Sequence, residues 1–449
     1  MKNEKGKKDF KILKISFLKG RSFNFYILHF IFLIALSSCT VSRNLQSKQV
    51  QSLLNDPALI NAHIGISIFD PGSNQYLYNH QGEKYFVPAS NIKIPTLYAA
   101  LKYLGDSIVG LRYAVTGNKV SILPAGDPTF LHPDFEKHPV YNFLKSFDTI
   151  QILNPLFDDD FLGSGWSWND YKSYYMAQKS NFPVYGNIVK FNWENSASVK
   201  IVPSYFQSET EVTETLTTGF QLEKPWDENS FVLLNGRSKT AEVPFRPDPG
   251  TILNLITDTL KKVVEFEYTK PKLKFQKLYS QRTDSLLKLM MYRSDNFYAE
   301  QALLMAGNEL FETMSTSKVT DTILNSSFSD LPQKPRWVDG SGLSRYNLFS
   351  PNDFIVILNK LKNEFGMERM KAIFATGGQG TISNYYKSDS TFIYAKTGTL
   401  SGVVALSGYL YTSKNKLLLF SVLVNNHNGS ATDVRRAVER FIQEVRRKR

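Results

Sequence analysis

The sequence has few of the residues that metal and redox sites require. It contains one cysteine, Cys39, and six histidines among 449 residues. A single cysteine excludes a disulfide within the chain and a cluster of thiolate ligands, and the histidines show no metal-ligand spacing. We therefore expect no metal and no cofactor.

Several catalytic and binding motifs are also missing from the sequence. There is no Gly-x-Ser-x-Gly segment to support a Ser-His-Asp hydrolase, and no Gly-x-x-x-x-Gly-Lys loop for nucleotides. The net charge is +12, but residues 1–38 hold eight basic and two acidic residues and so carry half of it. No basic helix or zinc framework accompanies this charge, and we expect no nucleic-acid partner.

The longest apolar run is too short to cross a bilayer. It covers residues 25–36 and follows a basic stretch, which is the arrangement of a signal peptide. The run leads into Leu36-Ser37-Ser38-Cys39, which resembles a bacterial lipobox. We expect residues 1–38 to be a lipoprotein signal peptide, Cys39 to carry a lipid anchor and residues 39–55 to be a tether. The alternative for Cys39 is an ordinary buried thiol.

Strand and helix patterns occur at both ends of the chain. Apolar segments bounded by turns predict strands over residues 63–70, 75–79, 391–400, 403–412 and 416–426. Helical spacing predicts a helix opening near Ser90, helices after residue 280 and an amphipathic helix over 431–449. We predict an α/β domain built from residues 56–115 and 271–449, with residues 116–270 as a β-rich insertion.

A serine and a lysine lie three positions apart at the start of the helix near Ser90. Ser90 and Lys93 would share one face of that helix. A serine hydroxyl attacks only when a base accepts its proton, and a helix amino terminus offers N–H groups to an oxyanion. Ser-x-x-Lys occurs five times in the chain, however, so a simple helix cap is the alternative for an isolated match.

Two downstream segments favour the catalytic interpretation of Ser90. They are Ser294-Asp295-Asn296 and Lys396-Thr397-Gly398, the second being the chain's one Lys-Thr-Gly. The three motifs in this order are the signature of penicillin-binding proteins and serine β-lactamases. Taken singly, the serine and asparagine could cap a loop, and the lysine could be a solvated residue of an edge strand.

The three motifs suggest a division of roles. Lys93 must be neutral to accept a proton, so its pKa must be lowered by burial and by a nearby positive charge such as Lys396. Lys396 could also pair with a substrate carboxylate. Ser294 would pass a proton to the leaving amine, and Asn296 would orient the substrate amide.

The oxyanion hole is predicted at the end of the third motif. Gly398 permits close approach of backbone and ligand. The Thr399 N–H would then complete the hole together with the Ser90 N–H. Thr397, Gly398 and Thr399 are thus the predicted substrate-binding residues.

The chain resembles the class C low-molecular-mass penicillin-binding proteins, the D-alanyl-D-alanine carboxypeptidase/endopeptidase group (peptidase family S13). Five further segments carry this resemblance: AGDPTF at 125–130, GWSWND at 165–170, PDPG at 247–250, DGSGLSRYN at 339–347 and GGQGTI at 377–382. The resemblance runs from about residue 60 to the end of the chain. The chain departs from the pattern near Tyr385, where a basic residue is expected.

The resemblance implies a penicillin-binding-protein/β-lactamase-like transpeptidase fold. This α/β fold has an antiparallel sheet flanked by helices, a helical subdomain, and here a β-rich insertion between the first and second motifs. The resemblance also implies hydrolysis of peptidoglycan stem peptides ending in D-Ala-D-Ala through an acyl-enzyme on Ser90. β-Lactams would acylate the same serine.

Two other functions remain open at this point. One is a serine β-lactamase, and the other is a non-catalytic, peptidoglycan-binding lipoprotein. In each case the expected partners are peptidoglycan peptides, β-lactams and a membrane reached through the lipid anchor. The expected location is the cell envelope, on the periplasmic side.

Overall fold

The computed structural model describes residues 47–195, 198–213, 221–234, 239–268 and 272–448. The predicted signal peptide and Cys39 lie outside these residues. Within the described ranges, no helix combines the length and the apolar character that crossing a membrane demands.

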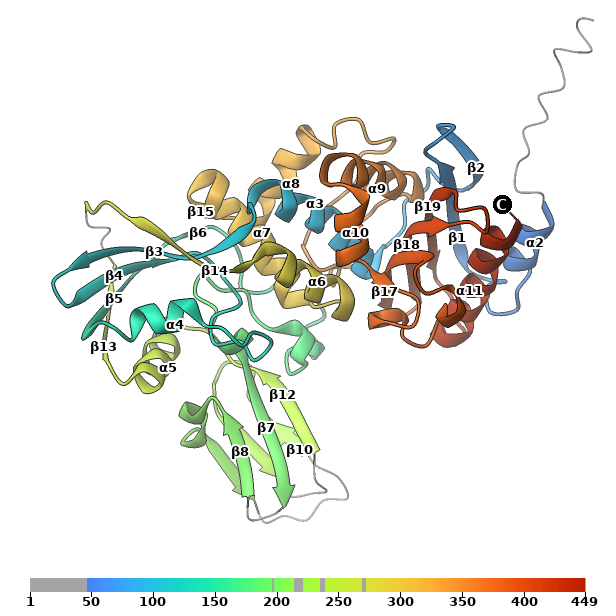
Figure 1. The fold of residues 1–449 in the computed structure, drawn as a ribbon. Coiled ribbons are helices and arrows are strands. Elements are labelled where there is room, and N and C mark those ends of the chain that lie inside the picture. The colour runs from blue at the N-terminus through green and yellow to red at the C-terminus, as the bar shows by residue number, and fades with distance from the viewer. Residues whose placement is uncertain (1–46, 196–197, 214–220, 235–238, 269–271, 449) are drawn as a thin grey trace, which may run out of the picture. The chain divides into compact units, whose positions relative to one another are not determined.

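A six-stranded antiparallel sheet joins the two ends of the chain (Figure 1). Its strands, in spatial order, are β16 (Ala375–Thr376), β17 (Ile393–Leu400), β18 (Val403–Tyr411), β19 (Leu417–Asn425), β1 (His63–Asp70) and β2 (Gln75–His80). The amino-terminal hairpin is attached through β1, where Ile64 lies opposite Val424 of β19. The strands expected near both termini are thus confirmed.

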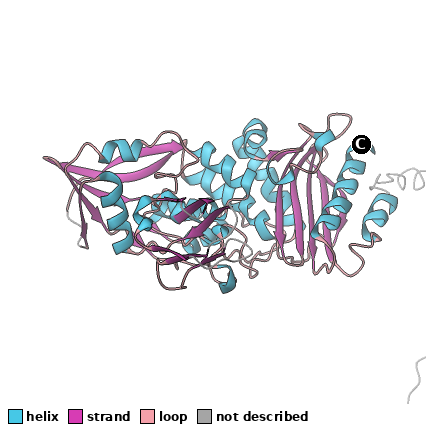
Figure 2. Ribbon diagram, turned by 90° about the horizontal axis from the view of Figure 1, so that it is seen from below, coloured by secondary structure: helices cyan, strands magenta, loops and turns pink. Residues whose placement is uncertain are grey.

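Helices cover both faces of this sheet, as Figure 2 shows. On one face lies α11 (Ala431–Lys448), whose apolar stripe includes Val438 and Phe441. The helix α2 (Ser47–Leu54) packs beside it and buries Val50 and Leu53 in the same cluster. The polar tether expected over residues 39–55 is therefore wrong for 47–54, because two apolar residues three positions apart give that segment a buried face.

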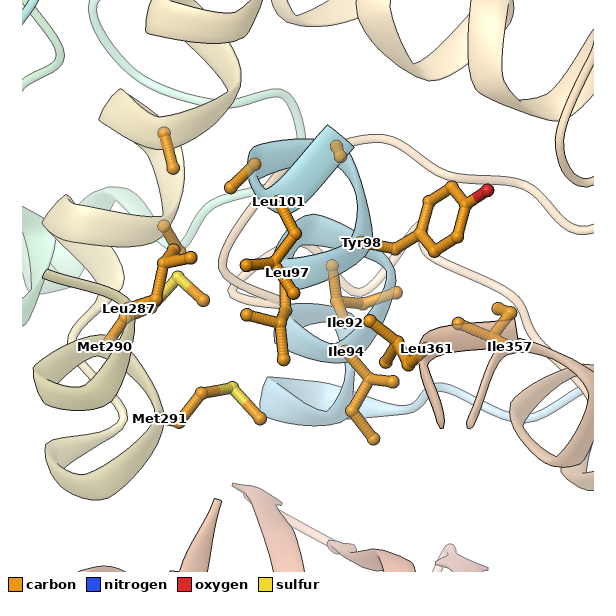
Figure 3. Close-up of a cluster of buried hydrophobic side chains, with 14 of the residues drawn as sticks. Ile92, Ile94, Leu97, Tyr98, Leu101, Leu287, Met290, Met291, Ile357 and Leu361 are labelled. Carbon is orange, nitrogen blue, oxygen red and sulfur yellow. The ribbon is translucent and has the colours of Figure 1, made fainter. Parts of the chain in front are cut away.

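The other face carries the helical part of the molecule. Its helices are α3 (Lys93–Tyr103), α6 (Thr283–Arg293), α7 (Asn296–Phe311), α8 (Thr316–Asn325), α9 (Pro351–Phe365) and α10 (Met367–Ile373). Figure 3 shows α3 with Leu97 and Leu101 turned toward Leu287 of α6, while Ile94 lies toward Leu361 of α9. Burying each such side chain stabilises the fold by about 1.5–3 kcal/mol. The helix carrying Lys93 is thereby fixed from several sides.

The segment between the first two motifs forms three sheets. The five-stranded sheet has the order β13 (Val263–Glu267), β5 (Thr149–Leu153), β4 (Lys119–Pro124), β3 (Ser107–Thr116) and β14 (Gln276–Arg282). One three-stranded sheet contains β12 (Lys239–Pro244), β7 (Ile188–Asn195) and β8 (Ser198–Val202), and the other β10 (Gln221–Glu223), β11 (Phe231–Leu234) and β9 (Thr210–Thr213). The short strands β6 (Leu156–Phe157) and β15 (Thr313–Met314) pair with each other.

The five-stranded sheet extends beyond the expected insertion limits of 116 and 270. β3 begins before the first limit and β14 lies wholly after the second, and both belong to this sheet, since β3 pairs with β4 and β14 pairs with β3. The helices α4 (Pro139–Leu144) and α5 (Pro249–Leu260) pack on a core shared with the smaller sheets. The division of the chain into a catalytic domain and an insertion stays a prediction. Because β3 and β14 are strands of the five-stranded sheet, they would belong to the insertion in such a division.

The remaining elements are single turns of 3₁₀ helix. They are η1 (Ala89–Ile92), η2 (Trp168–Asp170), η3 (Tyr174–Met176), η4 (Tyr185–Asn187), η5 (Ser204–Gln207), η6 (Gly380–Ile382) and η7 (Lys387–Asp389). The predicted helix near Ser90 thus begins as η1 and becomes α-helical at Lys93. Pro95 falls in the first α-helical turn, where a missing N–H is tolerated.

Candidate active site

Ser90 lies in η1, directly before α3. It is partly exposed, whereas its neighbours Asn91 and Lys93 are fully buried. The Asn91 side chain donates to the Ser407 hydroxyl of β18 at 2.7 Å and so ties this turn to the central sheet. Ala89 has a φ of +48°, which a non-glycine residue adopts only when its surroundings enforce it.

Lys93 lies beside Ser90 and contacts two other segments. Its Nζ is 3.2 Å from the Ser90 hydroxyl oxygen, 2.6 Å from the Asn296 side-chain oxygen and 2.7 Å from the Ser341 carbonyl. A neutral amine has two hydrogens, which match the two shorter contacts. Its lone pair is then left for the Ser90 hydroxyl.

Burial lowers the pKa of Lys93 to about 8. The loss of hydration is the largest cause, and the carboxylates of Asp295, Asp339 and Glu300 oppose it. The burial expected from the sequence is therefore the main cause, whereas the expected contribution from the charge of Lys396 is not found. A pKa near 8 leaves a usable neutral fraction close to neutral pH.

The second motif lies at the junction between α6 and α7. Ser294 ends α6 in a left-handed conformation with a φ of +60°. The Asp295 carboxylate accepts the Tyr298 backbone N–H at 2.9 Å and caps α7. Asn296 is the first residue of α7, and its side-chain amide donates to the Tyr175 carbonyl at 2.9 Å. The side-chain oxygen of Asn296 consequently stays directed at Lys93.

The third motif lies on β17. The Lys396 ammonium group is buried and lies 2.8 Å from the Ser294 hydroxyl oxygen and 2.7 Å from the Thr397 carbonyl. Burial, followed by repulsion from Lys93, places the pKa of Lys396 well below its ordinary value. The five predicted catalytic residues thus form two groups. Ser90 and Asn296 contact Lys93, and Ser294 contacts Lys396.

The three predicted substrate-binding residues follow Lys396 along β17. The Thr397 hydroxyl donates to the Thr381 hydroxyl at 2.7 Å. A Cβ atom at Gly398 would lie 2.7 Å from the Pro88 carbonyl oxygen and 3.1 Å from the Ser90 nitrogen. Glycine is therefore required for this strand to approach the serine so closely. The exposed Thr399 accepts a hydrogen bond from Arg435 at 2.8 Å.

Sequence reasoning missed two groups that hold Lys93 in place. The segment DGSGLSRYN supplies the Ser341 carbonyl, and its backbone N–H groups at Gly340 and Ser341 donate to Glu300 at 3.1 and 2.8 Å. Burial, with repulsion from Asp339, raises the pKa of Glu300 to about 7. The Asp-Gly-Ser-Gly segment was visible in the sequence, but it served only to support the family resemblance and was not linked to Lys93.

A cavity of about 670 Å³ adjoins the second motif. One wall consists of residues 293–297, and the others come from segments 131–134, 174–177 and 185–190 together with Val202 and Glu242. Most of the lining is therefore contributed by the segment between the first and second motifs. Among the described residues, no group of three or more His, Cys, Asp or Glu side chains is placed to hold a metal ion.

Known proteins resemble this chain over most of its length. A D-alanyl-D-alanine carboxypeptidase of Actinomadura sp. (strain R39) is 24% identical over 442 residues, covering 86% of this chain and 81% of the relative. The crystal structure of penicillin binding protein 4 (dacB) from Haemophilus influenzae has a TM-score of 0.69 at 21% identity, covering 89% of this chain and 98% of that one. Its complex with a β-lactam has a TM-score of 0.66 at 18% identity, with the same coverage.

These structural likenesses confirm the predicted fold. The model of the D-Ala-D-Ala carboxypeptidase 3 (S13) family matches residues 46–224 and 259–445, which is most of the chain. The two matched stretches include all three motifs. The chain therefore belongs to the D-Ala-D-Ala carboxypeptidase 3 (S13) family.

Proposed function

We propose that this chain hydrolyses peptidoglycan stem peptides ending in D-Ala-D-Ala through an acyl-enzyme on Ser90. The observation that carries the proposal is the 3.2 Å contact between the Ser90 hydroxyl and the Nζ of the buried Lys93. The family match and the carboxypeptidase relative support the substrate class. Cleavage of cross-links between stem peptides is the companion endopeptidase activity.

The first half of the reaction is acylation. Lys93 accepts the Ser90 proton as the hydroxyl attacks the carbonyl of the penultimate D-alanine. The bond of Asn296 to Lys93 keeps the amine directed at the hydroxyl. We assign the stabilisation of the oxyanion to the backbone N–H groups of Ser90 and Thr399, and the close approach of Gly398 to the Ser90 nitrogen supports this assignment.

The second half begins when the terminal D-alanine leaves. Its nitrogen needs a proton, which the Ser294 hydroxyl supplies while it takes one from the Lys396 Nζ 2.8 Å away. A water molecule then attacks the ester on Ser90, and the proton that the water loses restores the one given up by Lys396. Lys93 returns its proton to the Ser90 oxygen as the ester bond breaks, which completes hydrolysis. A β-lactam has no separate leaving group, so its acyl-enzyme persists.

Replacing Ser90 with alanine tests the nucleophile. Fluorescent penicillin is expected to label the purified protein, and Ser90→Ala is expected to lose all labelling because no other hydroxyl among the described residues contacts the Lys93 Nζ. The Ser294→Ala variant is the matched control, since it is expected to label slowly but covalently. Persistent labelling of Ser90→Ala on the gel, with the adduct mapped to another peptide, would refute the assignment.

Assays with three different ligands separate the proposed activity from the alternatives. Release of D-alanine from a defined muropeptide, followed by mass spectrometry, identifies a carboxypeptidase. Rapid turnover of nitrocefin without D-alanine release would instead identify a β-lactamase. Binding of peptidoglycan without either reaction would identify a non-catalytic protein.

The cell envelope is the location that this activity requires, because its substrate lies there. We propose further that the chain is exported to the periplasm and held on a membrane through a lipid on Cys39. The basic stretch, the apolar run and Leu36-Ser37-Ser38-Cys39 support this. α2 begins at Ser47, eight positions after Cys39, and packs on α11. The folded part would therefore be held close to the membrane.

A further inference from the structure

The cavity beside the second motif is larger than the leaving group of a carboxypeptidase requires. Its volume is about 670 Å³, and Ser294, the proposed proton donor to the leaving nitrogen, forms part of its wall. Cavities of about 300–1,000 Å³ hold ligands of drug size, whereas free D-alanine is a much smaller molecule. Because Ser294 has to touch the leaving nitrogen, the cavity begins where the leaving group lies and has room for a longer chain.

The lining contributed by the small sheet combines apolar side chains with opposite charges. Ile188 and Val202 supply apolar surface, and Lys190 of β7 and Glu242 of β12 supply the charges. The Lys190 Nζ lies 3.1 Å from the Glu242 carboxylate, and the two side chains are 42% and 43% exposed. An exposed ion pair of this kind contributes little to stability, so a ligand that carries a carboxylate or an amine can replace either partner at small cost.

Hydrogen bonds and an ion pair join this lining to the second motif. Asp134 pairs with Arg293, directly before Ser294, and the Tyr175 carbonyl accepts from the Asn296 side chain. Tyr174 also lines the cavity, and its ring is 62% exposed while its edge contacts the ring of Tyr175. A tyrosine ring held in this way offers a large, rigid contact surface. A chain bound in the cavity is therefore held in a fixed position relative to Ser294.

We propose that this cavity binds the leaving strand of a cross-linked peptidoglycan peptide. The inference rests on the proposed function, and it names the site that the second peptide occupies. In a cross-linked substrate the leaving nitrogen belongs to a second stem peptide, whose amide, amine and carboxylate groups continue past Ser294 into the cavity. Lys190 binds a carboxylate of that peptide, and the Tyr174 ring packs against the chain. The segment between the first two motifs thus contributes to the choice between single and cross-linked substrates.

Two substrates isolate this site in the purified protein. One is a single stem peptide ending in D-Ala-D-Ala, and the other is a cross-linked dimer without a free D-Ala-D-Ala end, so that only its cross-link can be cut. Products are quantified by mass spectrometry to give kcat/KM for each. Lys190→Glu and Tyr174→Ala are each expected to lower kcat/KM for the dimer roughly 5- to 20-fold, the effect of losing one contact to a charged or aromatic group. Release of D-alanine from the single peptide is expected to stay within about twofold, because that leaving group does not reach Lys190.

Lys119→Glu is the matched control. Lys119 forms a similar exposed pair with Glu265, at 3.0 Å, but neither residue lines the cavity. This variant is expected to cleave both substrates at the rates of the unmodified protein. Unchanged cleavage of the dimer by both cavity variants would overturn the inference. Equal losses on the two substrates would also overturn it, because they would show an indirect effect on Ser294.

The outcomes also separate this inference from the proposed function. If the unmodified protein cleaves neither substrate and is not acylated by penicillin, the proposed function fails. If it releases D-alanine from the single peptide but leaves the cross-linked dimer intact, only the assignment of the cavity fails.

Discussion

At the scale of single residues, Lys93 shows how burial makes a base. An exposed lysine is charged at neutral pH and has no lone pair to offer. Lys93 is fully buried, and the loss of hydration outweighs the three carboxylates that favour its charged form. Its two short hydrogen bonds, to Asn296 and Ser341, hold the amine against Ser90.

The pH dependence of acylation follows from this pKa. Because the pKa of Lys93 is lowered to about 8, the reactive neutral form is scarce below pH 8 and dominant above it. We expect the acylation rate constant for benzylpenicillin to rise about tenfold per pH unit up to about pH 8 and then to level off. Stopped-flow or quenched-flow measurements between pH 6 and 10 give the profile.

Thermal unfolding measured over the same pH range is the control for that profile. A rate that stays level between pH 6 and 10 while the protein remains folded would mean that Lys93 is not the group that titrates. A rate that is still rising at pH 10, as the ordinary lysine pKa of about 10.4 would require, would mean that burial does not lower the pKa of Lys93 as described.

At the scale of elements, the site depends on how closely three chain segments meet. The η1 turn carrying Ser90 is covered by Gly398 of β17 and by Gly342 of the Asp-Gly-Ser-Gly segment. A Cβ atom at Gly342 would collide with the Ala89 carbonyl, and Gly342 also has a φ of +84°. Asp339 holds that segment by accepting the Gly342 and Ser344 backbone N–H groups at 2.9 and 2.7 Å.

Replacing Gly342 with alanine is expected to disturb the site far more than backbone strain alone would. The added methyl group must push the η1 turn away, which moves Ser90 from Lys93. We expect acylation by fluorescent penicillin to slow at least tenfold, together with a lower midpoint of thermal unfolding.

Gly366 offers a matched control for this substitution. It has nearly the same φ, +83°, but no heavy atom lies within 4 Å of its would-be Cβ. Gly366→Ala is therefore expected to cost only the backbone strain of an alanine at φ +83° and ψ 146°, about 1–3 kcal/mol, and to leave the acylation rate unchanged. If both variants acylate at the same rate, close packing at Gly342 does not position Ser90.

At the scale of the whole molecule, the segment between the first two motifs takes part in the site. The Tyr175 carbonyl of that segment accepts from Asn296, and the Tyr298 hydroxyl of α7 donates to Asp134 at 2.8 Å. Arg293 is paired with the same carboxylate. The second motif is therefore fixed by residues of the intervening segment as well as by its own helices.

The predicted lipid anchor also belongs to this scale. Cys39→Ala is expected to move the protein from the membrane fraction to the soluble fraction of the envelope, because a lipidated cysteine supplies the hydrophobic attachment. The rate of acylation is expected to stay the same, since the residues of the proposed site lie at 90–93, 294–296 and 396–399, far along the chain from Cys39. Fractionation with an antibody, and the mass of the amino-terminal peptide, provide the measurements.

Cys39→Ser provides a control of similar size. It removes the thiol and is expected to behave like the alanine variant. If both variants remain with the membrane, or if the amino-terminal peptide of the unmodified protein carries no lipid, the anchor is elsewhere or absent.

The sequence by itself determined the strands at both ends, the terminal helix and the three motifs, because these depend on local spacing and on residue chemistry. It did not indicate that residues 47–54 pack against α11, since that contact joins the two ends of the chain. Only the tertiary structure decided that the Ser341 carbonyl and Glu300 hold Lys93 and its neighbours, and that the burial of Lys93 outweighs three nearby carboxylates in setting its pKa. Burial and distance arise from the packing of remote segments, which local sequence patterns do not describe.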